Sequence, residues 1–191
     1  VPVMGTHAHS WIMTFKDEYT AFKEYARLYP DACTLLVDTY DTLKSGVPNA
    51  IRVFTEMREA GIKPKSYGIR LDSGDLAYLS KKARKMLDDA GFQDAVIAAS
   101  NDLDEFLIHD LKMQGAAISS WGVGTNLITS KDCPSFGGVY KLAAIQNAEG
   151  EFQPKIKISE NIEKITNPGN KTIYRIYDKE TGMLRADLIC F

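Results

Sequence analysis

Along the first 130 residues, short apolar runs alternate with longer stretches in which apolar side chains recur every three or four positions. The apolar runs have the length and the turn-rich borders of buried β-strands; they cover residues 1–4, 33–37, 67–71, 95–99 and 116–121. The longer stretches have the spacing of amphipathic helices; they cover residues 16–28, 46–60, 76–90 and 103–113. Strands that alternate with helices predict parallel βαβ units, arranged either as a barrel or as an open sheet.

The pattern changes after Leu127, where further strands follow one another without helical stretches between them. The predicted strands cover residues 137–145, 152–159, 172–177 and 184–191. The sequence Asn147-Ala148-Glu149-Gly150 is a turn between the first two, which is typical of an antiparallel hairpin. We therefore predict an α/β core over residues 1–130 and a β-rich segment over residues 131–191 that completes or flanks it.

Charged and small residues crowd the carboxyl end of the predicted strand 67–71. Arg70, Asp72 and Asp75 lie close together there, and Ser73-Gly74 forms a turn into the next helix. An arginine holds a carboxylate or phosphate through two parallel hydrogen bonds, and an aspartate accepts hydrogen bonds from sugar hydroxyls. Because ligands bind outside the carboxyl ends of parallel strands, this stretch predicts a binding site. The alternative is a strand-end ion pair in which Asp75 is the N-cap of the next helix.

The first predicted strand is followed by Gly5, Thr6, His7 and, two residues further, His9. Histidine changes its charge near neutral pH and can act as a nucleophile, so this stretch is a candidate for chemistry. The alternative is that one of the two histidines is a hydrogen-bonded structural residue. No HExxH arrangement is present, which disfavours zinc hydrolysis.

The remaining strand ends are also polar. Asp38 and Thr39 follow one strand, and Asn101 and Asp102 follow another, where either residue could N-cap the helix from residue 103. The last strand leads into Gly122-Val123-Gly124-Thr125, whose glycines allow backbone N–H groups to approach an anion closely. This loop is a phosphate-binding candidate, although it lacks the lysine of a Walker A motif and is too short for a Rossmann fingerprint.

Composition narrows the class of partner. A formal net charge of -2 over 191 residues gives no support for nucleic acid or membrane as a partner. No apolar run reaches the roughly 18–20 residues that span a bilayer. The three cysteines are far apart and form no CxxC pair, so we expect neither disulfides nor a zinc site, and a cytoplasmic location. The abrupt apolar beginning and end of the chain are those expected of a piece of a longer protein.

Taken in order, five motifs resemble nicotinate phosphoribosyltransferases over essentially the whole chain. They are Gly5-Thr6-His7-Ala8-His9-Ser10, Leu36-Val37-Asp38-Thr39-Tyr40-Asp41, Gly68-Ile69-Arg70-Leu71-Asp72-Ser73-Gly74-Asp75, Gly122-Val123-Gly124-Thr125 and Gly138-Val139-Tyr140-Lys141-Leu142. The motifs match the middle and late regions of the sequences of that family. It implies the type II phosphoribosyltransferase fold, an incomplete α/β barrel with an additional domain built from the N-terminal part.

The resemblance also implies a reaction in NAD biosynthesis and salvage. Nicotinate and phosphoribosyl pyrophosphate give nicotinate mononucleotide and pyrophosphate, with ATP hydrolysis and Mg²⁺ assisting, in a homodimer. His9 would be the histidine that ATP phosphorylates, Thr6 and Arg70 would lie by nicotinate, and Asp72 would be catalytic, holding ribose hydroxyls or the metal. The residues implied for the phosphoribosyl group and its phosphate are Asp38, Ser73, Gly74, Asn101, Gly122, Gly124 and Thr125. Which carboxylate holds Mg²⁺ stays open among Asp38, Asp72 and Asp75.

The family's N-terminal part, which supplies aromatic stacking on the pyridine ring and helps to build the site across a dimer, is missing here. The chain by itself is therefore expected to be inactive. Nicotinamide phosphoribosyltransferase is the nearest alternative, although the Gly5–Ser10 and Arg70–Leu76 motifs favour the nicotinate enzyme. Quinolinate phosphoribosyltransferase, which should not need ATP, is more distant. A non-catalytic phosphosugar-binding α/β domain is the alternative from another class.

Overall fold

A computed structural model describes residues 5–191 of the chain. The strand predicted over residues 1–4 lies outside the described residues. The chain divides into two compact units, Val1–Ser135 and Phe136–Phe191, whereas the sequence placed a boundary at residue 130. None of the helices in residues 5–191 is both long enough and apolar enough to span a bilayer.

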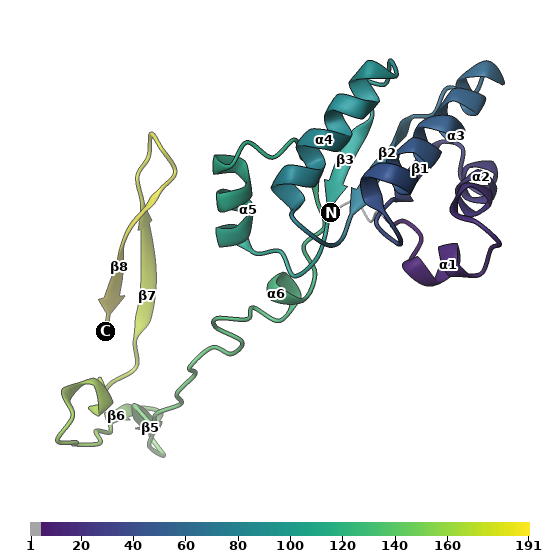
Figure 1. Cartoon of the computed structure of the whole chain (residues 1–191). Coiled ribbons are helices and arrows are strands. Elements are labelled where there is room, and N and C mark those ends of the chain that lie inside the picture. Colours follow the sequence, from purple (N-terminus) through teal and green to yellow (C-terminus); the bar gives the residue numbers. More distant parts are fainter. Residues whose placement is uncertain (1–4) are drawn as a thin grey trace. The chain divides into compact units, whose positions relative to one another are not determined.

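The first unit contains a four-stranded parallel sheet (Figure 1). Its strands are β1 (Ala32–Leu36), β2 (Ser66–Leu71), β3 (Val96–Ala99) and β4 (Ser120–Trp121). Each strand pairs with the next one along the chain, in the order β1-β2-β3-β4. This sequential order is that of an α/β barrel, not of a doubly wound sheet. Among the described residues β1 and β4 do not pair with each other, so the sheet is open.

Four helices of the predicted spacing flank this sheet. They are α2 (Glu18–Leu28), α3 (Val47–Glu59), α4 (Leu76–Asp89) and α5 (Glu105–Met113). Helices α2 and α3 contact each other, as do α3 and α4, which run side by side in Figure 1. The core lies between the helices and the sheet, and its fully buried side chains include Phe22, Leu35, Ile69, Leu87 and Ile97. Burial of these side chains is the main stabilising contribution to the unit.

The short elements of the first unit were not predicted. They are α1 (His9–Met13), a π-helical turn over Thr42–Gly46 and α6 (Thr125–Ile128). Asp41 is the N-cap of the π-helical turn, and its side chain accepts hydrogen bonds from the N–H groups of Leu43 and Lys44. Local capping of this kind gives no apolar periodicity, so a reading of the hydrophobic pattern does not detect it.

Two predicted boundaries are wrong. Helix α5 is capped by Asp104, which accepts from the Leu107 N–H, and not by Asn101 or Asp102. Those two residues have φ angles of 97° and 47°, in the left-handed region, whereas an N-cap has extended backbone. Strand β4 is shorter than the predicted 116–121, because the Ala117 N–H donates to the Ser80 hydroxyl of α4 instead of joining the sheet.

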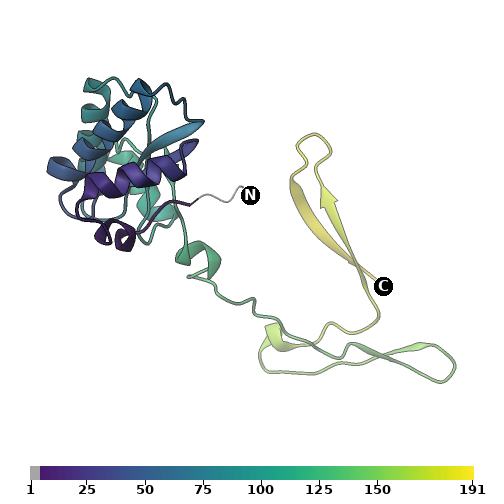
Figure 2. The same cartoon turned by 90° about the vertical axis from the view of Figure 1, so that its right-hand side faces the viewer.

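The second unit consists of two antiparallel ribbons (Figure 2). They pair β5 (Ala144–Gln146) with β6 (Phe152–Pro154), and β7 (Thr172–Tyr177) with β8 (Leu184–Cys190); a 3-10 turn covers Ile162–Lys164. The predicted turn at residues 147–150 is present, with the Gly150 N–H donating to the Asn147 carbonyl. Strands β5 and β6 are shorter than predicted. Beyond β6, Lys157 bonds to Thr166 and not to a strand.

The predicted fold class is confirmed by this arrangement. A parallel α/β sheet with the strand order of an incomplete barrel comes first along the chain, and antiparallel β-structure follows it. Parallel strands carry their carboxyl ends to the same edge of the sheet, and this edge holds the residues singled out by the sequence.

Candidate functional site

Asp38, two residues after the end of β1, joins the ends of two strands. Its Oδ2 accepts hydrogen bonds from the Asp72 N–H and from the Ser73 hydroxyl, both at 2.7 Å. The Asp38 side chain is only 2% exposed. Its Oδ1 is buried and has no hydrogen-bond partner among the described residues. A buried carboxylate oxygen without a donor is costly, so this oxygen is available to a cation or to a hydrogen-bond donor.

Asp72, directly after β2, turns one oxygen to the neighbouring strand and the other to the open edge. Its Oδ1 accepts a hydrogen bond from the Ser100 hydroxyl, which follows β3. Its Oδ2 lies 3.7 Å from His9 Nε2, and a third of the side chain is exposed. The loops after three adjacent strands therefore converge on a pair of carboxylates with one free oxygen each.

His9 begins α1 and brings an imidazole to this pair. Its Nε2 lies 4.0 Å from Asp38 Oδ1 and 3.7 Å from Asp72 Oδ2, and its Nδ1 lies 3.0 Å from Thr39 Oγ1. The side chain is 39% exposed, so the ring can be reached from outside. Ionised carboxylates only accept hydrogen bonds, so they favour the proton on Nε2 and leave the lone pair of the neutral ring on Nδ1.

His7 has the opposite environment. It is 7% exposed, its ring packs edge-on against Tyr25 with centroids 4.6 Å apart, and its Nε2 accepts from the Leu36 N–H at 3.2 Å. Burial lowers the pKa of His7 to about 4, and the nearby Arg70 charge lowers this pKa as well. His7 is therefore the structural histidine of the pair, bonded to the Leu36 N–H of β1, and His9 is the one at the site.

Thr6 makes a local hydrogen bond, whereas the Nε of Arg70 has no hydrogen-bond partner among the described residues. The Thr6 hydroxyl donates to the adjacent His7 carbonyl at 3.0 Å, a local bond. Arg70 lies on the sheet face opposite the buried Ile69 and Leu71, by the alternation of a strand. Its Nε is buried and has no partner among the described residues, so its guanidinium retains donors for a ligand.

Gly74 and Asp75 lie in the turn after β2 and have structural roles there. Gly74 has a φ of 76°, which a residue without Cβ adopts without strain. Asp75 is the N-cap of α4, and its Oδ1 accepts from the Tyr78 N–H at 2.9 Å. The structural role foreseen for Asp75 is present, and the two carboxylates that converge are Asp38 and Asp72.

The loop after β4 is only partly free to bind an anion. The Gly122 N–H already donates to the Ala99 carbonyl at 2.7 Å. Gly124 is the N-cap residue of α6, and Thr125 is the first residue of that short helix. Asn126 donates through Nδ2 to the carbonyls of Asp102 and Leu103, at 2.8 and 3.1 Å, and so ties this loop to the one that contains Asn101.

Three residues at this edge had no role assigned from the sequence: Thr39 contacts His9, Ser100 contacts Asp72, and Asn126 bonds to the loop that contains Asn101. Each is a hydroxyl or amide side chain next to a predicted residue. Such short polar side chains are common at strand ends and turns for local reasons, so their type alone does not single them out.

Mg²⁺ needs oxygen ligands, and the site supplies them. No cluster of three or more His, Cys, Asp or Glu side chains arranged to hold a metal is found in residues 5–191. Mg²⁺ is commonly held by one or two carboxylates together with phosphates of the substrate. The free oxygens of Asp38 and Asp72 fit that mode, whereas a site made by protein ligands alone is absent from the described part of the chain.

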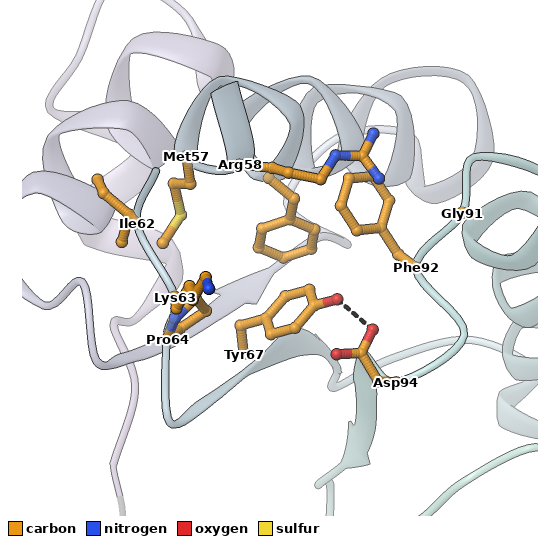
Figure 3. Close-up of a pocket in the computed structure, with 10 residues that line it drawn as sticks. Met57, Arg58, Ile62, Lys63, Pro64, Tyr67, Gly91, Phe92 and Asp94 are labelled. Carbon is orange, nitrogen blue, oxygen red and sulfur yellow. Dashed lines mark hydrogen bonds between the residues drawn. The ribbon is translucent and has the colours of Figure 1, made fainter. Parts of the chain in front are cut away.

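A cavity of about 280 Å³ lies at the other, amino-terminal edge of the sheet (Figure 3). Phe54, Tyr67 and Phe92 pack edge to face around it, and Arg58 stacks on the Phe92 ring at 4.5 Å. The Tyr67 hydroxyl donates to the carboxylate of Asp94, and burial raises the pKa of this tyrosine. These groups satisfy one another and include neither histidine, so the candidate site remains the carboxyl edge.

Comparison with known proteins gives the chain's relatives. No protein-family model matches it. It is 58% identical over 189 residues to a nicotinate phosphoribosyltransferase of Bacillus subtilis, and this match covers 99% of the chain and 38% of that protein. It is 40% identical over 234 aligned positions to a nicotinate phosphoribosyltransferase of Dictyostelium discoideum, again over 99% of the chain and 38% of that protein.

Among solved structures, the chain resembles a human nicotinic acid phosphoribosyltransferase with a TM-score of 0.75 and 26% identity. That likeness covers 98% of the chain and 43% of the human protein. The chain thus spans well under half the length of the relatives it matches. Within that span, it belongs to the nicotinate phosphoribosyltransferase family.

Proposed function

We propose that the chain carries the phosphoribosyl site of a nicotinate phosphoribosyltransferase, which joins nicotinate to phosphoribosyl pyrophosphate and releases pyrophosphate. The observation that carries the proposal is the convergence of His9, Asp38 and Asp72 at the carboxyl edge of the sheet. The similarity to nicotinate phosphoribosyltransferases supports assigning phosphoribosyl transfer to these residues. The product, nicotinate mononucleotide, would serve NAD biosynthesis and salvage.

Bond formation at the anomeric carbon passes through oxocarbenium-like positive charge. A fixed carboxylate beside the ribose stabilises that charge because it needs no reorganisation during the reaction. Asp72 suits this role, since the Ser100 hydroxyl orients its Oδ1 and leaves Oδ2 exposed. Asp72 would also accept hydrogen bonds from the ribose hydroxyls, with Ser73, Gly74 and Asn101 nearby in the same loops.

Nicotinate carries a carboxylate, and Arg70 is the cation suited to it. The buried and unpartnered Nε supports this role, because a bound carboxylate would satisfy it through a bidentate pair. Thr6 would add a hydroxyl donor near the pyridine ring. The 5′-phosphate would lie at the loop of Gly122, Gly124 and Thr125.

Mg²⁺ would be held by the free oxygens of Asp38 and Asp72 together with the pyrophosphate of the substrate. When bound there, it would neutralise charge on the departing pyrophosphate. The carboxylates that hold it come from adjacent strands and are joined through the Asp38 bond to the Asp72 N–H, so their spacing is set by the sheet.

His9 would accept the γ-phosphoryl group of ATP, coupling ATP hydrolysis to synthesis. A phosphorylated His9 would add negative charge beside the loops after β1 and β2 and could order them around Mg²⁺ and substrate. The proposal further includes a cytoplasmic homodimer, which the family resemblance implies.

The proposal is tested in the full-length protein with γ-labelled ATP. We expect an acid-labile, base-stable label on the protein that is lost in His9→Ala and kept in His109→Ala, whose histidine is exposed on α5. His9→Ala should also lose ATP-stimulated synthesis and keep a slow ATP-independent reaction. Equal use of nicotinamide, or binding of phosphoribosyl pyrophosphate without turnover, would contradict the proposal.

A further inference from the structure

We infer that Thr39 is a positioning residue for His9: its hydroxyl holds Nδ1 of the resting ring and then donates to the phosphoryl group that Nδ1 receives. This inference rests on the proposed function, since it concerns transfer from ATP to His9. It assigns a role to a side chain that lies in the Leu36–Asp41 motif but had none assigned from the sequence.

Thr39 follows Asp38 in the loop after β1, and its Oγ1 lies 3.0 Å from His9 Nδ1. The opposite ring nitrogen, Nε2, faces the free oxygens of Asp38 and Asp72 at 4.0 and 3.7 Å. The ring is therefore held between a hydroxyl on one side and two carboxylates on the other.

The neighbours of the His9 ring determine which nitrogen carries its proton. The two carboxylates only accept, so the neutral ring keeps its proton on Nε2 and its lone pair on Nδ1. Thr39 is then the donor in its bond to Nδ1.

In the proposed reaction, the γ-phosphoryl group passes from ATP to Nδ1 of His9. The Nδ1 lone pair attacks the γ-phosphorus, the bond from that phosphorus to the β,γ-bridging oxygen breaks, and ADP leaves with the electron pair. The ring proton stays on Nε2, which lies 4.0 Å from Asp38 Oδ1 and 3.7 Å from Asp72 Oδ2. The Thr39 hydroxyl, released from the nitrogen, now lies within reach of a phosphoryl oxygen and donates to it.

The test uses the full-length protein and compares Thr39→Val, which keeps the shape, with Thr39→Ser, which keeps the hydroxyl. We expect labelling of His9 by γ-labelled ATP to slow by about 10- to 100-fold in Thr39→Val, the loss of one transition-state hydrogen bond. Thr39→Ser should retain the wild-type rate within a few-fold. Thr55→Val is the matched control, because the Thr55 hydroxyl bonds only to the Ile51 carbonyl within α3 among the described residues.

A spectroscopic reading separates positioning from folding. With ¹⁵N-labelled histidine, His9 should show a protonated Nε2 and a hydrogen-bonded, unprotonated Nδ1, and the Nδ1 resonance should move in Thr39→Val but not in Thr55→Val. Wild-type labelling speed in Thr39→Val, or equal slowing in both Thr39 variants, would overturn the inference. An unlabelled wild-type protein would instead contradict the proposed ATP step, so the two failures are distinguishable.

Discussion

The carboxylate of Asp38 accepts a hydrogen bond from the main-chain N–H of Asp72 at 2.7 Å, and this bond ties the end of β1 to the end of β2. The two residues are 34 positions apart in the sequence. The bond aligns two carboxylates whose remaining oxygens face His9. The geometry of the candidate site therefore depends on a contact that also stabilises the sheet edge.

Replacing Asp38 should lower both stability and order at that edge. Asp38→Ala leaves the Asp72 N–H and the Ser73 hydroxyl without their acceptor, and we expect a loss of about 2 kcal/mol in the free energy of unfolding. Urea denaturation of the chain measures this change. Asp31→Ala, at an exposed position, should stay within about 0.5 kcal/mol of wild type, and a similar loss there would argue against a specific role.

His7 should make stability depend on pH. Its pKa is about 4 in the folded chain, against 6.5 for an exposed imidazole, so the unfolded chain binds more protons between these values. Stability should therefore be full above pH 6.5 and fall as the pH drops towards 4. Between about pH 7.5 and 4.5 the contribution of His7 amounts to about 2 kcal/mol.

The measurement is denaturation at both pH values for wild type and for His7→Gln, whose amide oxygen can accept from the Leu36 N–H. The variant should lose about 2 kcal/mol less than wild type on acidification. His109→Gln, on an exposed helix face, controls for the replacement of a histidine by glutamine. An unchanged pH dependence in His7→Gln would show that His7 is not held neutral.

Asp75 should behave as a helix cap. Its Oδ1 accepts from the Tyr78 N–H, so Asp75→Ala should cost about 1 kcal/mol of stability, whereas Asp75→Ser should restore most of it. Thermal or urea unfolding of the three proteins gives the comparison. A large stability loss in the serine variant as well would mean that the carboxylate charge, and not the cap, matters.

Gly68 begins the Gly68–Asp75 motif, and close packing against the backbone of Val96 leaves no room there for a side chain. A Cβ built at this position in β2 would lie 2.0 Å from the Val96 carbonyl oxygen of the adjacent chain segment. Gly68→Ala should therefore destabilise the chain by about 3 kcal/mol, since backbone atoms cannot move aside cheaply. Gly124→Ala, where a Cβ meets nothing within 4 Å, is the control for stability. Comparable unfolding midpoints for the two variants would contradict this account.

The 191-residue chain by itself should not make nicotinate mononucleotide. It spans 38% of the length of its Bacillus subtilis relative, and the resemblance leads us to expect that part of the site comes from outside this span. Product formation is measured with nicotinate, phosphoribosyl pyrophosphate, ATP and Mg²⁺, with the full-length protein as the positive control. Appreciable turnover by the chain would mean that its own residues suffice.

The hydrophobic pattern was enough to locate the main elements of the first unit. Helices α2, α3 and α4 and strand β2 begin or end within two residues of their predicted limits, because their buried faces repeat at the helical or strand period. The N-cap of α5 was misplaced, since Asn101, Asp102 and Asp104 are all good capping residues and only the backbone angles distinguish them.

Local periodicity and residue type were sufficient to predict the fold class and the stretches where polar residues follow strands. Only the tertiary structure shows which of those polar residues contact one another. The fold makes His7 a buried acceptor and His9 an exposed ring, although they lie two positions apart in one motif. It also brings Asp38 to Asp72 and Thr39 to His9, since such contacts depend on strand pairing between distant segments, which periodicity does not encode.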